Sequence, residues 1–248
     1  IVNIYQAKRW GLLIEHFNEK SDFKQYLKII TYSNLLAEIS FLGIFSRALI
    51  RLYSRIKIVN VFITLLIEKF MSLYAILFLS AFSIFLLYQS TTFEYYNDYF
   101  KYIFFIIFLG LTSPYILLKI SESKYLIIFN KLKRFFIIFY FLKKEYFFKV
   151  FLKTLIIQIL AIIKVFIVTR MFDLNVNIIL LILILPIINF FVSIPASITP
   201  WGWREFIYIN ILSFLGLSNE QSILISLTNS VLLVSTQFLF YLIFLRVR

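Results

Sequence analysis

The stretch SIPASITPWGWREF, residues 193–206, is a polar interruption in a chain that is otherwise strongly apolar. It contains two prolines, one glycine, two tryptophans and an adjacent Arg-Glu pair. Proline cannot continue a helix, because it lacks a backbone N–H and its ring clashes with the preceding turn, so Pro195 and Pro200 predict a break. The sequence on either side predicts two helical limbs, residues 178–193 and 203–214, which this break joins as a hairpin.

The composition of the 248-residue chain is that of a membrane protein. Hydrophobic residues make up 62% and charged residues 15% of the sequence, and the mean hydropathy is +0.92, whereas about a quarter of a soluble domain is charged. A helix needs about 20 apolar residues to cross a bilayer. Continuous runs that meet or approach this length, one of them carrying two lysines, are residues 70–93, 102–118, 150–169, 174–203 and 221–245. We therefore predict an all-α, polytopic helical membrane protein in which residues 1–248 form a single domain.

The charges between these runs predict the orientation of the chain. Basic residues gather on the cytoplasmic side of membrane proteins, and residues 121–149 are rich in Lys and Arg, so we expect this loop to be cytoplasmic. Residues 89–101 carry two acids against one lysine and suit the outer side, while the closing Arg-Val-Arg at 246–248 suits the inner side. The segment 178–216 must then leave and return to the same side, which predicts a re-entrant hairpin with broken helices, centred on residues 195–205.

The turn of this hairpin carries the residues that we expect to bind a ligand. Gly202 allows a tight turn before the second limb, and Arg204 and Glu205 occupy its first turn. A helix N-terminus favours anions, and a guanidinium can grip a phosphate with two hydrogen bonds. The predicted ligand is an anionic lipid headgroup, with Glu205 either orienting Arg204 or meeting a cationic group of the lipid. Alternatively, Arg204 only anchors the fold by pairing with Glu38, Glu68 or a lipid phosphate.

Two other cations are candidates for additional phosphate contacts. Arg47 lies in FLGIFSRALI, residues 41–50, and Lys164 lies deep in the run 150–169, on the same helical face as two other lysines. The alternative for these lysines is that they extend to the membrane surfaces. Glu68 lies inside an apolar run, and we expect it to pair with Arg47 or to carry a proton.

The segments FLGIFSRALI and PWGWREF share a glycine followed by an arginine, and each precedes a long apolar run. Transporters are often built from such internal repeats. These two segments are therefore candidates for corresponding positions in two pseudo-repeated halves of the chain.

The same residues resemble the signature of the lysylphosphatidylglycerol synthase transmembrane region family, also called flippase-like membrane proteins. SIPASITPWGWREF followed by LSFLGLSNEQSILISL matches the family pattern at Pro195, Gly202, Arg204, Glu205, Gly216 and Ser226. Pro200 replaces the first glycine of the family's turn, and Ile44 and Ser72 stand where the family often has acids. Weaker similarity at AKRWGLLI, FLGIFSRALI and LLIEKFMSL extends the resemblance over nearly the whole chain.

The resemblance implies a lipid-translocating or lipid-handling domain of the bacterial inner membrane. In the namesake enzymes a soluble acyltransferase-like domain aminoacylates phosphatidylglycerol, and transport of the product to the outer leaflet is attributed to the membrane part. We expect the flippase-like part without the synthase, acting on anionic, aminoacylated or glycosylated lipids. Family members usually have one or two further helices before the position of Ile1, so an upstream segment is expected here.

The sequence argues against other classes of protein. It has no cysteine, one histidine and twelve singly scattered acids, so we expect no metal site, no cofactor and no enzymatic activity. Its basic residues lie between apolar runs, which disfavours nucleic-acid binding. One alternative stays open, a non-transporting subunit that scaffolds a glycosyltransferase or the machinery of envelope polysaccharide or lipid synthesis. The loop 121–149 would then be its docking surface. The oligomeric state is left open.

Overall fold

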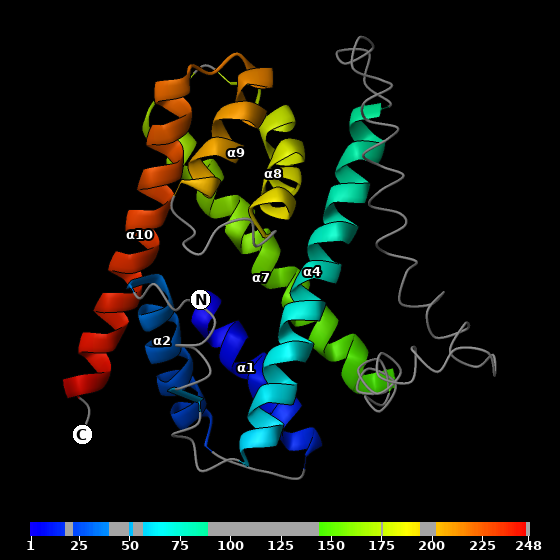
Figure 1. The fold of residues 1–248 in the computed structure, drawn as a ribbon, viewed down its shortest axis with the longest axis vertical. Helices are drawn as coiled ribbons and strands as arrows, with labels where there is room; N and C mark the ends of the chain where they lie inside the picture. The colour runs from blue at the N-terminus through cyan, green and yellow to red at the C-terminus, as the bar shows by residue number, and fades with distance from the viewer. Residues whose placement is uncertain are drawn as a thin grey trace.

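The computed structural model describes residues 1–17, 22–39, 50–51, 57–88, 144–174, 176–193 and 202–246, and these residues are helical with short connections (Figure 1). The helices are α1 (Val2–His16), α2 (Phe23–Ile39), α4 (Ile58–Tyr88), α7 (Lys144–Met171), α8 (Ile178–Ser193), α9 (Trp203–Leu212), the 3-10 helix η2 (Ser213–Leu215) and α10 (Asn219–Arg246). Within the described ranges no strand occurs. The predicted all-α class is confirmed.

Three of the helices are long and apolar enough to cross a membrane, over Ile58–Leu86, Tyr146–Met171 and Asn219–Ile243. Their outer faces carry large exposed apolar side chains, such as Phe148, Leu152 and Ile159 on α7, as expected where a helix meets lipid. The predicted runs 150–169 and 221–245 lie inside α7 and α10, and 70–93 overlaps α4. The predicted run 102–118 lies outside the described residues.

The predicted hairpin is present as α8 and α9. In Figure 1 α8 descends from the upper end of the molecule, and α9 returns to that end beside it. Their 16 and 10 residues give lengths of about 24 and 15 Å at 1.5 Å per residue, too short for a hydrocarbon layer of about 30 Å. The limb 178–193 coincides with α8, and the limb 203–214 covers α9 and most of η2. The turn itself, with Pro195 and Pro200, lies outside the described residues.

A second hairpin of short helices, α1 and α2, lies in the lower half of the molecule (Figure 1). The two helices pack against each other and share an apolar core with the start of α4, in which Trp10, Tyr26 and Ile30 are buried. The α8–α9 hairpin has a core of its own with α4, α7 and α10. Each half of the molecule is therefore packed around one hairpin.

The packing of the described helices repeats with inverted direction. Helix α2 packs on α10 as α8 packs on α4, α1 packs on α2 as α7 packs on α8, and α1 and α7 pack on each other. In Figure 1 the corresponding helices run in opposite directions, since α2 and α4 rise where α8 and α10 descend. This is the arrangement of an inverted repeat. The sequence analysis proposed the segment 41–50 as the start of one of the two halves, but most of this segment lies outside the described residues. The evidence for a repeat is therefore the packing of the helices.

The ends of the described helices gather at two ends of the molecule. Helices α4 and α7 begin, and α10 ends, at the lower end of the molecule, while both ends of the α8–α9 hairpin lie at the upper end (Figure 1). Lys57 and Lys149 therefore lie toward the same end. The loop 89–101, residues 121–143 and the last two residues lie outside the described part of the chain.

Candidate functional site

The start of α9 is fixed by Gly202 and Glu205. Gly202 precedes the helix with φ +86°, a backbone conformation that favours glycine. The Glu205 carboxylate accepts a hydrogen bond from the backbone N–H of Gly202 at 2.5 Å through Oε2. Its Oε1 accepts another from the hydroxyl of Ser226 on α10 at 3.1 Å. Glu205 thus caps α9 and ties its first turn to α10.

Arg204 reaches the same face of α10 one turn further on. Its Nη1 donates a hydrogen bond to Oγ of Ser230, whose own hydroxyl donates to the carbonyl oxygen of Ser226 at 2.9 Å. Ser226 and Ser230 are four residues apart and so share one helix face. Arg204 and Glu205 therefore form hydrogen bonds with the hydroxyls of Ser230 and Ser226, one turn apart on α10. No hydrogen bond or ion pair joins Arg204 to Glu205 in the described structure.

The charge of Arg204 is not neutralised by a carboxylate within the described residues. Both ion pairs seen there involve Glu68, and neither includes Arg204. The side chain of Arg204 is half-buried, and its hydrogen-bond partner Ser230 is uncharged. Charges inside a membrane are costly and generally serve function, so this guanidinium is suited to an anionic ligand.

Aromatic side chains flank Arg204 on α9. The indole N–H of Trp203 donates to the carbonyl oxygen of Phe191 on α8 at 3.1 Å, and its ring stacks on Phe206. Tyr208 is 2% exposed. On α10, Oδ1 of Asn229 is buried and accepts no hydrogen bond in the described structure. An unused acceptor therefore lies between the two serines in the sequence of α10.

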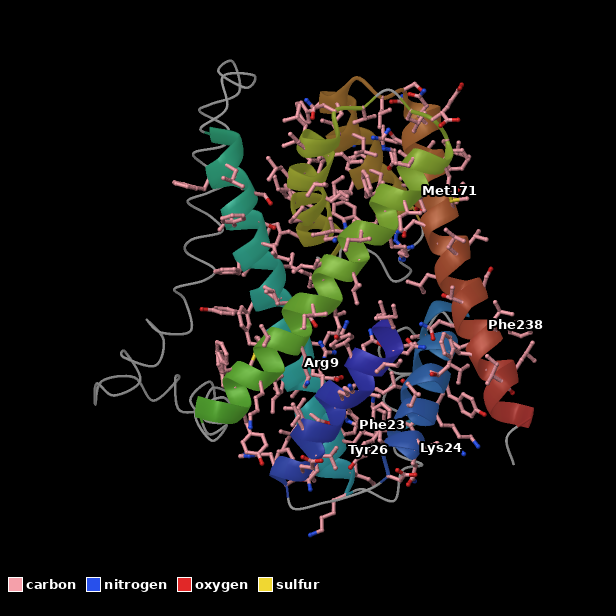
Figure 2. All side chains as sticks on the ribbon, turned by 180° about the vertical axis from the view of Figure 1, so that it is seen from behind. Arg9, Phe23, Lys24, Tyr26, Met171 and Phe238 are labelled. Atoms are coloured by element: carbon pink, nitrogen blue, oxygen red, sulfur yellow. The ribbon has the colours of Figure 1, made fainter. Side chains whose placement is uncertain are left out.

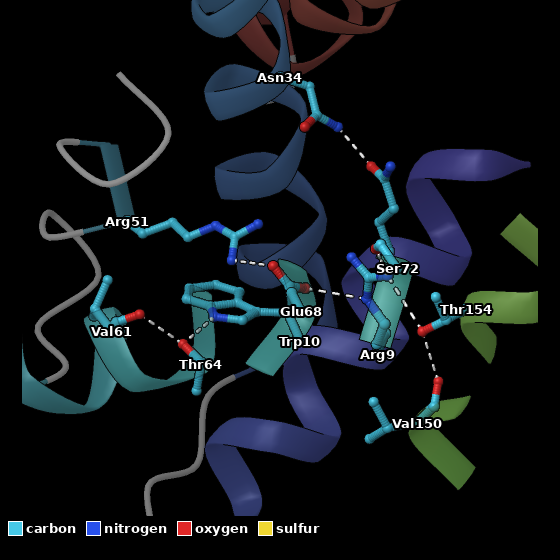
Figure 3. Close-up of polar contacts among 11 residues, drawn as sticks. Arg9, Trp10, Asn34, Arg51, Val61, Thr64, Glu68, Ser72, Val150 and Thr154 are labelled. Carbon is cyan, nitrogen blue, oxygen red and sulfur yellow. Dashed lines mark hydrogen bonds and ion pairs between the residues drawn. The ribbon is translucent and has the colours of Figure 1, made fainter. Parts of the chain in front are cut away.

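A second charged cluster is formed by Arg9 of α1, Glu68 of α4 and Arg51 (Figure 3). Nε of Arg9 lies 3.2 Å from Oε1 of Glu68, and Nη1 of Arg51 lies 2.5 Å from Oε2. Arg9 also donates through Nη1 to the hydroxyls of Ser72 and Thr154, both at 3.3 Å. All three charged residues are at most 6% exposed. One carboxylate thus binds two guanidiniums, one through each of its oxygens.

Trp10 of α1 packs against this cluster. The guanidinium carbon of Arg51 lies 5.1 Å from the centroid of its ring, a cation–π distance. The indole N–H donates to Thr64 at 3.2 Å, and the ring meets Tyr26 edge-on. Figure 2 shows Arg9 in the interior, where α1, α4 and α7 meet. The cluster therefore joins helices that are far apart in the sequence.

A third polar group links α10 to the lower hairpin. Asn3 and Gln237 exchange two hydrogen bonds, from Nδ2 to Oε1 at 2.8 Å and from Nε2 to Oδ1 at 3.0 Å. Asn34 of α2 donates to Gln6 at 2.6 Å and to Asn3 at 3.4 Å. The group consists of amides and hydroxyls without charge, so we assign it to packing.

The structure brings together three of the five residues that the sequence singled out. Gly202, Arg204 and Glu205 form one site, whereas Lys164 is half-buried on α7, and Arg47 lies outside the described residues. Glu68 is paired, as one of the alternatives predicted, but with Arg9 and Arg51.

Sequence reasoning missed Ser230 and the role of Arg9. The four-residue spacing of Ser226 and Ser230 could have indicated that Ser230 shares a helix face with Ser226. No local pattern connects Arg9 to Glu68, which lies 59 residues away.

The chain matches the family model described as the lysylphosphatidylglycerol synthase TM region over residues 1–242. The match covers nearly the whole chain, so the protein belongs to this family. No curated protein and no solved structure matches the chain.

Proposed function

We propose that this member of the lysylphosphatidylglycerol synthase transmembrane region family is a lipid translocase. It binds the headgroup of an anionic or modified lipid at Arg204 and moves it between the leaflets of the membrane. Family membership supports a lipid-related role in the membrane, and the site at the start of α9 supports the choice of ligand.

The observation that carries the proposal is the uncompensated charge of Arg204. Within the described residues Arg9 and Arg51 share a carboxylate, but Arg204 is held only by a serine hydroxyl. A lipid phosphate would supply the missing negative charge and accept hydrogen bonds from the guanidinium. The unused Oδ1 of Asn229 suits a ligand that carries a hydroxyl or amine beside its phosphate.

The other residues of the site position Arg204. Both oxygens of Glu205 accept hydrogen bonds from the protein, so its role in the proposal is to fix α9 against α10. Trp203 fixes the same turn against the end of α8. The hairpin places this turn away from both ends of the molecule (Figure 1), where a headgroup in transit needs a partner.

The proposal includes a location and excludes catalysis. We place the protein in the bacterial inner membrane, with the end that carries Lys57 and Lys149 in the cytoplasm, because that end is basic. The protein then transports lipid without changing it. Its partners are the lipid itself and the machinery that synthesises it.

The first test compares lipids that co-purify with the full chain in mild detergent, for wild type, Arg204→Ala and Arg170→Ala. Arg170 is an exposed cation at the end of α7 and serves as the control for lost charge. Losing a charged hydrogen bond costs about 1.5–3 kcal/mol, or roughly one to two decades of affinity. Mass spectrometry should therefore find one enriched anionic, aminoacylated or glycosylated lipid that only Arg204→Ala loses.

Translocation is then measured in proteoliposomes, as the rate at which a fluorescent analogue of that lipid becomes accessible to an impermeant quencher. Arg204→Ala should slow this rate, and Arg170→Ala should not. If all three proteins carry the same bulk lipid and none speeds translocation, the translocase proposal fails. The search then turns to a protein partner of the loop 121–149, as the scaffold alternative requires.

A further inference from the structure

The polar contacts between α9 and α10 extend beyond Arg204. Tyr208 follows Arg204 by four residues, so the two side chains share one face of α9, and Tyr208 is 2% exposed. Asn229 directly precedes Ser230 on α10, and its side chain forms a hydrogen bond with Tyr208. Two neighbouring pairs, Arg204 with Ser230 and Tyr208 with Asn229, therefore join the two helices.

The amide of Asn229 has one oxygen that these contacts do not use. Its Oδ1 is buried and has no hydrogen-bond partner in the described structure, so the contact with Tyr208 uses the amide nitrogen. Buried polar atoms of native proteins are nearly always hydrogen-bonded, and an unsatisfied one costs free energy that a donor would recover. Asn229 therefore offers an acceptor to a ligand that brings a hydrogen-bond donor.

This acceptor lies close to the proposed phosphate partner. Arg204 donates to Ser230, the residue that follows Asn229, and consecutive Cα atoms are only about 3.8 Å apart. A headgroup whose donor is a few bonds from its phosphate therefore reaches both side chains at once.

We propose that Asn229 selects lipids whose headgroup carries a hydroxyl beside the phosphate, with this hydroxyl donating to Oδ1. The inference rests on the proposed function, which places the phosphate at Arg204. The selected class comprises lipids in which a glycerol, an inositol or a sugar is linked to the phosphate. Lipids whose headgroup ends in a methyl or trimethylammonium group leave Oδ1 without a donor and bind more weakly.

The number of unused acceptors favours a hydroxyl over an ammonium group. A hydroxyl has one donor, whereas an ammonium has three, and Oδ1 of Asn229 is the one buried side-chain acceptor without a partner among the described residues. Both oxygens of the nearby Glu205 carboxylate already accept hydrogen bonds, from Gly202 and Ser226. One amide oxygen thus satisfies a hydroxyl completely, but it leaves a buried ammonium short of partners, which is costly.

The test compares lipids that differ in one group. Phosphatidylglycerol carries hydroxyls, phosphatidylmethanol has the same charge and no donor, and phosphatidylethanolamine has an ammonium in place of the hydroxyls. Each lipid is titrated into the full chain in detergent, and bound lipid is counted by native mass spectrometry. The proteins are wild type, Asn229→Leu and Tyr208→Phe. Thr236→Leu, at an exposed position of the same helix, is the control for loss of a polar side chain from α10.

We expect wild type and Thr236→Leu to bind phosphatidylglycerol about three- to tenfold more tightly than phosphatidylmethanol, the effect of one neutral hydrogen bond. Asn229→Leu should bind both lipids as weakly as wild type binds phosphatidylmethanol. Tyr208→Phe should lose part of the preference, because the amide of Asn229 is no longer held. Absence of the preference in wild type, or its persistence in Asn229→Leu, overturns the inference. Phosphatidylethanolamine binding as tight as that of phosphatidylglycerol overturns the choice of a hydroxyl.

The two proposals fail in different ways. Arg204→Ala should weaken phosphatidylglycerol and phosphatidylmethanol equally, because both lipids carry the phosphate. If Arg204→Ala changes neither lipid but Asn229→Leu still removes the preference, the phosphate site at Arg204 is wrong and the hydroxyl site at Asn229 stands. If Arg204→Ala weakens both and Asn229→Leu keeps the preference, the reverse holds. If Asn229→Leu does not fold, Tyr208→Phe decides, and an undiminished preference in that variant overturns the inference.

Discussion

Gly202 holds the backbone before α9 at φ +86°, and no atom of the described residues lies within 4 Å of the place where a Cβ would lie. Gly202→Ala therefore meets no steric obstacle among these residues, and its cost is the strain of a left-handed backbone, about 1–2 kcal/mol. Thermal unfolding in detergent should show this loss. Because the strain is relieved by moving the first turn of α9, the lipid that depends on Arg204 should also bind more weakly.

Gly216 provides the matched control for this substitution. It has φ +76° and is equally open, but it lies at the other end of α9, after η2. Gly216→Ala should lose similar stability and keep its lipid. Equal lipid loss in both variants would show that binding follows overall stability, contrary to the expected role of Gly202.

At the scale of single residues, the sequence singled out charged side chains but did not predict the partners that the structure gives them. Arg204 was singled out because a charge inside an apolar chain is costly and is usually kept for a function. Its contact with Ser230 depends on the angle at which α9 meets α10, which no local pattern specifies. For the same reason the partner of Glu68 was expected at Arg47, whereas the fold supplies Arg9 from α1 and Arg51.

At the scale of elements, the contact between α10 and the lower hairpin depends on the reciprocal amide pair of Asn3 and Gln237. Gln237→Leu leaves the amide of Asn3 without this partner, and membrane hydrogen bonds of this kind contribute about 0.6–1.7 kcal/mol. We expect a stability loss of about that size in a denaturation series in detergent. Thr236→Leu, at the neighbouring exposed position, is the control.

The double variant Asn3→Leu with Gln237→Leu tests whether the loss comes from the unsatisfied amide. Replacing both partners by apolar groups removes the penalty of a buried unpaired group, so the double variant should be more stable than the sum of the single effects predicts. Strict additivity would contradict the pairing.

The elements themselves were predicted unevenly. The bounds of α8 and the start of α9 follow from proline, glycine and the end of an apolar run, all of which act locally. Helices α1 and α2 were not predicted as a hairpin, because Lys8, Arg9 and Glu15 interrupt their apolar pattern. The buried Arg9 is stabilised by hydrogen bonds to Glu68 of α4 and Thr154 of α7. A search for apolar runs cannot predict such contacts between distant segments.

At the scale of the whole molecule, the proposed orientation can be tested with single cysteines, since the 248-residue chain has none of its own. Cysteines at Lys57 and Lys149 lie at the basic end, and cysteines at Asn177 and Ser218 lie at the ends of the α8–α9 hairpin. In intact cells an impermeant maleimide that has crossed the outer membrane should label the second pair. The first pair should react only after the inner membrane is permeabilised.

The reverse labelling pattern would invert the orientation, and labelling of Asn177 and Ser218 from opposite sides would show that α8 and α9 do not form a re-entrant hairpin. The orientation is a prediction from charge placement and span length, which act over the entire chain. The two Gly-Arg segments suggested a repeat but did not predict how the two halves pack, because apolar helices of similar composition can pack against one another in many ways.

Arg204 lies at the start of α9 in the upper half of the molecule, and Arg9 lies on α1 in the lower half, so these two arginines lie at different depths (Figures 1 and 2). On the proposed function, a headgroup that passes both arginines crosses the membrane in two shorter steps, with a positive charge near the end of each step. The rate of a stepwise passage is limited by its highest barrier and changes about tenfold for every 1.4 kcal/mol. Dividing one tall barrier into two lower ones therefore speeds the passage without tighter binding at either stop.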